Sequence, residues 1–173
     1  MDQLKGKISI GCDLIQAEKL SEQLIRLLPA GLDIRTVNTL RLGLREMLIN
    51  SIEHGNLEVG FEQKTDEAIR SDYLEFLLER QKLPQYAGRR VIVEYDITPK
   101  HAAFRISDDG RGFDHRRMRQ NALQGENNLD LAHGRGIKMT LRVFDKVRYN
   151  TRGNRVTLFK RFSVAAASRA KGA

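Results

Sequence analysis

Residues 44–56, with the sequence LREMLINSIEHGN, constrain the fold more than any other stretch, because they have a helical period and two very different faces. A helix advances by about 100° per residue, which places Glu46, Asn50, Glu53 and His54 within one arc. The opposite side is apolar and consists of Val37, Leu40, Leu44, Leu48 and Ile52. One face is therefore expected to pack on a core, while the other presents a specific polar set. An ordinary solvated face would also explain these polar residues, so the interpretation depends on the rest of the chain.

Length and composition indicate a single globular domain. The chain has 173 residues, of which 40% are hydrophobic and 30% are charged, enough for one full hydrophobic core. No apolar run approaches the ~18 residues of a membrane helix, and the start MDQLKGKISIGC lacks the apolar stretch of a signal peptide. We therefore expect an unprocessed cytoplasmic protein. The single Cys12 and four dispersed histidines predict neither a disulfide nor a zinc site.

The net charge of +8 needs an explanation, since a basic protein can bind nucleic acid, a membrane surface or an anionic ligand. Part of the excess lies in residues 114–120 and part in the C-terminal tail. Aromatic residues make up only 6% of the chain and do not alternate with the basic ones, so the sequence offers no stacking platform for bases. Direct binding of nucleic acid or membrane is not expected.

The N-terminal half reads as one strand followed by helices. Residues 5–12 alternate as a strand does, and Asp13 is placed to cap a helix that ends at Pro29 and Gly31. Asp33 is placed to cap the long helix described above, for which Gly55 is the expected left-handed C-cap. Residues 62–82 are charged and helical in pattern, and we expect them to form an accessory helix.

The C-terminal half reads as a hairpin, a helix and two further strands. Residues 89–98 and 101–107 are β-branched runs joined by Pro99 and Lys100. A helix over 136–144 is expected to precede a strand near 146–151 and a last strand near 155–163. We assign residues 1–163 to one domain and 164–173 to a disordered tail.

Two glycine clusters flank a polar segment between the hairpin and the last helix. DDGRGFD at 108–114 and HGRGIKM at 133–139 each contain a Gly-x-Gly, but neither extends to a dinucleotide-binding fingerprint or a P-loop. Glycine lets a backbone approach a ligand closely or adopt a positive φ. The second cluster also opens a helix, where free N–H groups attract phosphate. Each cluster alone would be explained by a tight turn, but their order along the chain is more informative.

The order of these motifs resembles the family of gyrase, histidine-kinase and MutL-type ATPases. Its N box corresponds to Glu46 and Asn50, its first glycine box to Asp108, Gly110 and Gly112, and its second to Gly134 and Gly136. The resemblance runs from about residue 5 to 162. Within this family, the chain looks most like the anti-sigma-factor serine kinases of bacterial partner-switching systems. The features that carry this likeness are the small size and the segments EMLINSIEHGN, SDDGRGFD, HGRGIKM and GNRVTLFKRF. The resemblance implies a two-layer α/β sandwich, with a mixed, largely antiparallel sheet covered on one face by helices.

The resemblance also implies ATP and Mg²⁺ as cofactors and gives roles to particular residues. Mg²⁺ prefers oxygen ligands and keeps much of its water, so the side-chain oxygen of Asn50 would suffice as its protein ligand. Glu46 would orient or deprotonate the attacking hydroxyl. Asp108 would accept a hydrogen bond from the adenine amino group, where guanine has a carbonyl oxygen, and Asp109 is expected to be exposed. His54 either supports the rim of this site or is structural.

Further expectations concern the phosphates and the segments around them. Residues 115–133 correspond to the ATP lid. Ala132 and His133 stand where these kinases often have a basic residue, which leaves Arg135 as the candidate contact for the γ-phosphate. Thr157 is assigned to the adenine pocket, with an ordinary strand residue as the alternative. The helical insert at 58–88 either adds a partner surface or caps the sheet.

The function implied by the resemblance is transfer of phosphate from ATP to a serine or threonine of an anti-anti-sigma (STAS-type) partner. The protein would also sequester a sigma factor, and we expect it to act as a homodimer. Two alternatives are a non-catalytic binding module that responds to ATP and a trans-acting histidine-kinase-like ATPase domain. No histidine precedes His54, which disfavours autonomous histidine autophosphorylation. In a third alternative, a basic nucleic-acid-binding or scaffold protein, the motifs would be coincidence.

Overall fold

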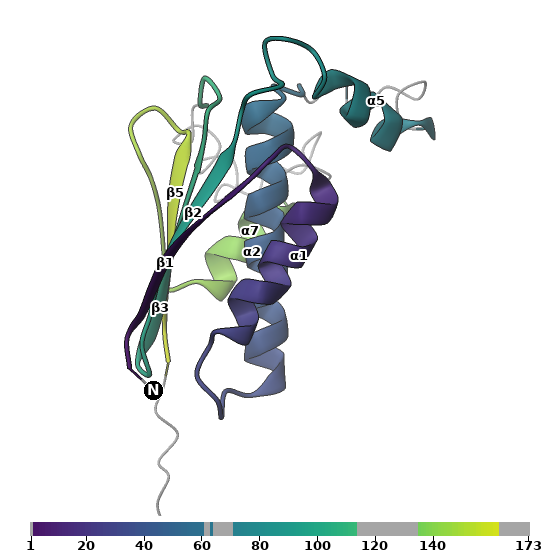
Figure 1. Cartoon of the computed structure of the whole chain (residues 1–173). Coiled ribbons are helices and arrows are strands. Elements are labelled where there is room, and N and C mark those ends of the chain that lie inside the picture. The colour runs from purple at the N-terminus through teal and green to yellow at the C-terminus, as the bar shows by residue number, and fades with distance from the viewer. Residues whose placement is uncertain (1, 61–62, 64–70, 114–134, 163–173) are drawn as a thin grey trace, which may run out of the picture.

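A five-stranded sheet with helices on one face forms the body of the protein, as Figure 1 shows. The structure, a computed structural model, describes residues 2–60, 63, 71–113 and 135–162. The strands are β1 (Leu4–Ile10), β2 (Val91–Ile97), β3 (His101–Asp108), β4 (Lys146–Tyr149) and β5 (Arg155–Arg161). They lie in the order β1-β2-β3-β5-β4, and each of these neighbouring pairs is antiparallel. The predicted two-layer α/β fold is confirmed.

Among the described residues, three α-helices cover the sheet and a fourth stands apart from them at one end, as Figure 1 shows. The covering helices are α1 (Leu14–Arg26), α2 (Ile34–Asn50) and α7 (Arg135–Val143), and the outlying one is α5 (Tyr73–Arg80). Asp13 accepts a 2.8 Å hydrogen bond from the N–H of Ile15, and Asp33 accepts one of 2.9 Å from Thr36. Both predicted N-caps are confirmed.

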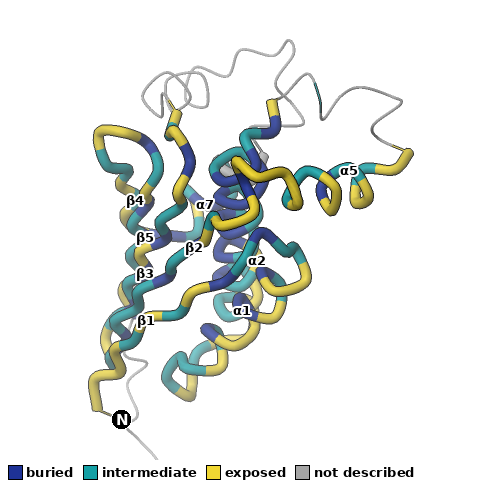
Figure 2. Tube along the Cα trace, turned by 45° about the horizontal axis from the view of Figure 1, so that its top comes forward, coloured by how far each residue is buried: buried dark blue, intermediate teal, exposed yellow. Residues whose placement is uncertain are grey.

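The core lies between the helices and one face of the sheet. Alternate residues of the central strands are fully buried, and they include Val91, Val93, Ile97, Ala102, Phe104, Ile106 and Leu158. From the helical layer, Leu24, Leu40, Leu44, Leu48 and Ile52 meet them, all with no exposed surface. Figure 2 shows this buried interior between the two layers. The apolar arc predicted for α2 is the arc that packs on the sheet.

The C-terminal end of α2 differs from the prediction. The helix continues as a π-helical turn, η1 (Ser51–Asn56), in which the N–H of Leu57 bonds the carbonyl of Ile52 at 2.8 Å. Gly55 lies inside this turn, and the residue with positive φ is Glu58, at 50°. The expected left-handed cap at Gly55 is therefore wrong. The wider turn inserts one extra residue and brings Gly55 and Asn56 to the end of β3.

Several predicted segments lie wholly or partly outside the described residues. The lid at 115–133 and the tail at 164–173 are among them, and so is part of the accessory helix, whose described portion is α5. Within the residues that the structure describes, none of the helices has the length and apolar character needed to cross a membrane.

Candidate functional site

A cavity of about 220 Å³ opens beside the C-terminal end of α2. Residues from α2, η1, the end of β3 and the β4–β5 hairpin surround it. Its lining consists of Met47, Asn50, Ser51, His54, Gly55, Val59, Gly60, Asp108, Gly112, Phe113, Tyr149, Gly153, Arg155 and Val156. A mostly apolar wall with a few convergent polar groups is typical of a small-molecule site.

Asp108 is the acidic residue of this cavity and ends β3. Its N–H bonds the carbonyl of Asn154 at 3.0 Å, and its carbonyl accepts a 3.1 Å bond from the Asn154 side chain. Its carboxylate accepts the N–H of Gly110 at 2.9 Å. Burial raises the pKa of Asp108 to about 6, although the Gly110 bond and the charges of Arg152 and Arg89 act in the opposite direction. Asn154 therefore fixes the backbone of Asp108, and Gly110 fixes its carboxylate.

Asn56 fixes the backbone of Asp109, the residue that follows Asp108. It has no exposed surface, and its side-chain oxygen accepts the N–H of Asp109 at 2.8 Å. The carboxylate of Asp109 turns outward and accepts the N–H of Arg90 at 2.8 Å. Asp109 is exposed, as expected, while Asp108 is half-buried and faces the cavity.

Glycine is required where η1 meets the end of β3. A Cβ atom on Gly55 would lie 2.5 Å from the carboxyl carbon of Asp108, and one on Gly110 would overlap the carbonyl oxygen of Gly55. The two backbones therefore touch without intervening side chains. This close approach explains why residue 110 of the first glycine box is a glycine. It also shows that residue 55 is a glycine because its backbone packs against the side chain of Asp108.

Gly112 meets the β4–β5 turn and has a φ of +82°. A Cβ atom there would overlap the carbonyl oxygen of Arg152, so both the conformation and the space favour glycine. Beside it, Phe113 meets Tyr149 edge to face, with ring centroids 5.3 Å apart. The Tyr149 hydroxyl donates to the Met47 sulfur at 3.7 Å. These side chains form an apolar wall of the cavity.

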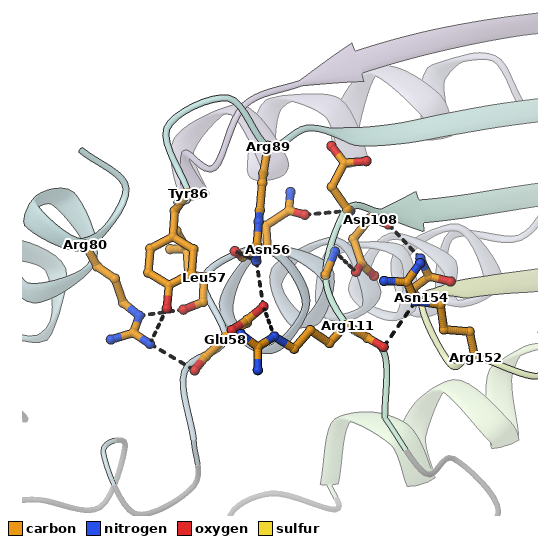
Figure 3. Close-up of polar contacts among 12 residues, drawn as sticks. Asn56, Leu57, Glu58, Arg80, Tyr86, Arg89, Asp108, Arg111, Arg152 and Asn154 are labelled. Carbon is orange, nitrogen blue, oxygen red and sulfur yellow. Dashed lines mark hydrogen bonds and ion pairs between the residues drawn. The ribbon is translucent and has the colours of Figure 1, made fainter. Parts of the chain in front are cut away.

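Two arginines from the insert and the segment after it bind the end of η1, as Figure 3 shows. Arg80 of α5 donates to the carbonyls of Leu57 and Glu58 and to the Tyr86 hydroxyl. Arg89 donates to the carbonyl of Asn56 at 2.7 Å and to the Glu58 carboxylate at 2.9 Å. Their guanidinium carbons lie 4.9 and 5.0 Å from the centre of the Tyr86 ring. The insert is thus joined to the turn that touches Asp108.

The structure brings several of the predicted site residues together. Asn50, Asp108 and Gly112 line one cavity, and Gly110 packs against the carboxylate of Asp108 and the backbone of Gly55. His54 also lines the cavity, with its Nδ1 atom 2.7 Å from the carbonyl oxygen of Val59. Glu46 is half-buried one helical turn before Asn50 and does not contribute to the cavity lining.

Thr157 is not part of the cavity. Its neighbours Val156 and Leu158 are buried against the helices, so strand alternation turns Thr157 to the opposite face, opposite Arg105 and Arg148 in the register. The assignment of Thr157 to the adenine pocket is therefore corrected, and the last strand contributes Val156 instead. Arg135 and Gly136 begin α7, but the side chain of Arg135 and the whole of Gly134 lie outside the described residues.

Sequence reasoning missed residues that matter for this site. Asn154 bonds the backbone of Asp108, but in the sequence it is only a turn residue after Gly153. Asn56 looks like the end of a helix, and nothing in the sequence signals its bond to Asp109. Met47 had a usable signal, because it precedes Asn50 by three residues and His54 by seven, which places all three along one helix face.

Comparison with known proteins agrees with this architecture. Residues 13–160 match the histidine kinase-like ATPase domain, which is most of the chain. The protein therefore belongs to the histidine kinase-like ATPase domain family. A search of curated proteins finds no match.

Proposed function

We propose that this protein is an ATP-dependent protein serine/threonine kinase of the anti-sigma-factor type. It would phosphorylate an anti-anti-sigma partner, sequester a sigma factor and act in the cytoplasm as a homodimer. The observation that carries the nucleotide part is the half-buried carboxylate of Asp108 in a cavity that also holds Asn50 and Gly112. The family match and the order of the motifs support an ATP-dependent activity, while the substrate and the partners rest on the resemblance.

The residues around the cavity suit a magnesium nucleotide. The Asp108 carboxylate can accept a hydrogen bond from the adenine amino group, and the side-chain oxygen of Asn50 is a suitable ligand for Mg²⁺. Gly112 also lines the cavity, and a Cβ atom there would overlap the carbonyl oxygen of Arg152 in the β4–β5 turn. Bound ATP would supply the phosphoryl group, which the hydroxyl of a partner serine or threonine accepts while ADP leaves. Glu46 would take the proton of that hydroxyl.

The nucleotide part is tested by calorimetric titration with ATP, with and without Mg²⁺. We expect saturable binding of ATP in preference to GTP, weakened in Asp108→Asn, and loss of the Mg²⁺ dependence in Asn50→Ala. Absence of ATP binding by the wild-type protein would refute the proposal.

The catalytic part is tested separately with Glu46→Ala. We expect this variant to keep its ATP affinity and to lose phosphate transfer to purified STAS-domain proteins by about a hundredfold or more. Equal transfer by wild type and variant would remove Glu46 from the mechanism.

A non-catalytic binding module that responds to ATP is the second candidate. One observation favours it: Glu46 does not contribute to the cavity lining, although Asn50 does. ATP binding without detectable transfer to any STAS-domain protein would support this candidate over the kinase.

A further inference from the structure

The sheet has one face that the helices leave uncovered, which we call the open face. Figure 1 shows α1, α2 and α7 all on the other side. Since Val91, Val93, Phe104 and Leu158 are buried against those helices, the residues that alternate with them point to the open face. The strand register therefore defines this surface.

The half of the open face on β1, β2 and β3 has charges of both signs. Lys5 pairs with Asp96 at 3.5 Å, and Arg105 pairs with Glu94 at 3.2 Å. Lys7 lies opposite Glu94 in the register. Cations and carboxylates nearly balance on this half.

The half on β4 and β5 is different, and we call it the basic half. Its charged residues are Lys146, Arg148, Arg155 and Arg161, and each of them is exposed. Arg155 begins β5 and also lines the cavity, but its Nε donates to the Ser107 hydroxyl of the open face at 3.0 Å. The other outward positions of these two strands are Thr157 and Phe159, so neither described strand places a carboxylate here. Asp145, just before β4, binds Lys160 and the backbone N–H of Arg161. Four cations thus gather on one side of a protein whose net charge is +8.

We propose that the basic half of the open face is a docking surface for an acidic segment of a protein partner. The complementarity of charge selects the occupant, because such a surface attracts carboxylates and repels other cations. A second copy of this chain would present the same basic surface and would be repelled. This inference does not depend on the proposed kinase activity.

Two features favour a protein over a nucleic acid or a lipid surface. The aromatic ring on this face, Phe159, is already stacked on His101 at 5.3 Å, and the Lys146 ammonium lies 5.9 Å from its centre. The ring is therefore engaged within the protein and is not a free platform for a base. The half of the face with Glu94 and Asp96 is nearly balanced in charge, so the basic surface stops at β5 and does not extend across the sheet as the backbone of a long nucleic acid would need.

The test uses a fluorescein-labelled peptide of glutamate and serine residues, with fluorescence anisotropy as the readout. Arg148→Glu/Arg161→Glu reverses two cations of the basic half. Lys19→Glu/Arg26→Glu makes the same change in net charge at exposed positions of α1, in the helical layer. We expect binding to weaken by about tenfold in the first variant and by less than about twofold in the second. Arg148→Gln/Arg161→Gln should give an intermediate loss, and thermal unfolding of each variant checks that the fold is kept.

Three results would overturn the proposal. One is that the wild-type protein does not bind the peptide, and another is that both charge-reversed variants lose binding equally, which would mean that net charge alone is responsible. The third is tighter binding, at equal salt, to a single-stranded DNA oligonucleotide or to phosphatidylserine vesicles than to the peptide.

Discussion

At the scale of single residues, burial of Asp108 disfavours the charged form of its carboxyl group. Burial raises its pKa to about 6, whereas an aspartate in an unfolded chain titrates near 3.9. The folded state therefore binds this proton more tightly than the unfolded state. The resulting stabilisation is fully present below about pH 4 and is lost as the pH rises through about 6. This difference of about two units between the folded and unfolded pKa corresponds to at most about 3 kcal/mol in the free energy of unfolding.

Asp108→Asn removes this titration, so we predict a pH-dependent difference between the variant and the wild type. The free energy of unfolding of Asp108→Asn relative to wild type should rise by about 1–3 kcal/mol between pH 4.5 and pH 7.5. Urea unfolding at several pH values measures this, with Glu75→Gln on the exposed side of α5 as the control. A difference that does not change with pH would show that Asp108 titrates normally.

A substitution at Gly55 tests the close approach between the backbone of η1 and the side chain of Asp108. Gly55→Ala places a methyl group 2.5 Å from the carboxyl carbon of Asp108, so either the turn or the carboxylate must move. We expect a loss of about 1–3 kcal/mol in the free energy of unfolding and a weaker affinity for ATP. Gly88→Ala is the matched control, since a Cβ atom there has nothing within 4 Å, and it should change stability by less than about 0.5 kcal/mol. Similar effects of the two substitutions would contradict the packing argument.

At the scale of elements, the insert stabilises the end of η1. The last carbonyls of a helix lack partners within the helix. Arg89 donates to the carbonyl of Asn56, the last residue of η1, and Arg80 donates to the carbonyls of Leu57 and Glu58, which follow it. We predict that Arg80→Ala lowers the free energy of unfolding by about 1–3 kcal/mol, because these carbonyls lose a charged donor. It should also weaken ATP binding, since the same turn holds Asn56 against Asp109.

The control for Arg80 is Lys82→Ala. Lys82 carries the same charge two residues later, but its partner is the exposed Glu79 at 2.6 Å, and an exposed pair contributes little. Urea unfolding and calorimetric titration measure both variants. If Arg80→Ala behaves like Lys82→Ala in both measurements, the insert is not coupled to the nucleotide site.

The elements that could be predicted from sequence were those with local signals. The caps at Asp13 and Asp33 and the hairpin of β2 and β3 follow from neighbouring residues. The place of Asn50 in the site rested instead on the order of the motifs and the family resemblance. The π-helical turn has no such signal in its own sequence, and the contact of Gly55 with Asp108 joins residues that are far apart in the chain. Thr157 was misassigned for a related reason, since only the register of β5 decides which face a strand residue occupies.

At the scale of the whole molecule, the sheet brings distant segments to one end. The antiparallel pairing of β3 with β5 places Asp108 beside the β4–β5 turn, where Gly112 meets Arg152. The end of α2 reaches the same point through η1. The cavity thus forms where three parts of the chain converge, and its shape depends on how the helical layer is held against the sheet.

Phe144 links two helices of that layer. It is 3% exposed and follows α7, and a Cβ atom on Gly43 of α2 would lie 2.9 Å from its ring. We predict that Phe144→Ala lowers the free energy of unfolding by about 3–5 kcal/mol, because the cavity it leaves is not refilled. That is a large part of the roughly 5–15 kcal/mol that stabilises a domain of this kind. Phe144→Leu retains most of the volume and should cost less than about 1.5 kcal/mol. Urea unfolding of both variants distinguishes them, and equal losses would mean that the contact with Gly43 does not hold α7 against α2.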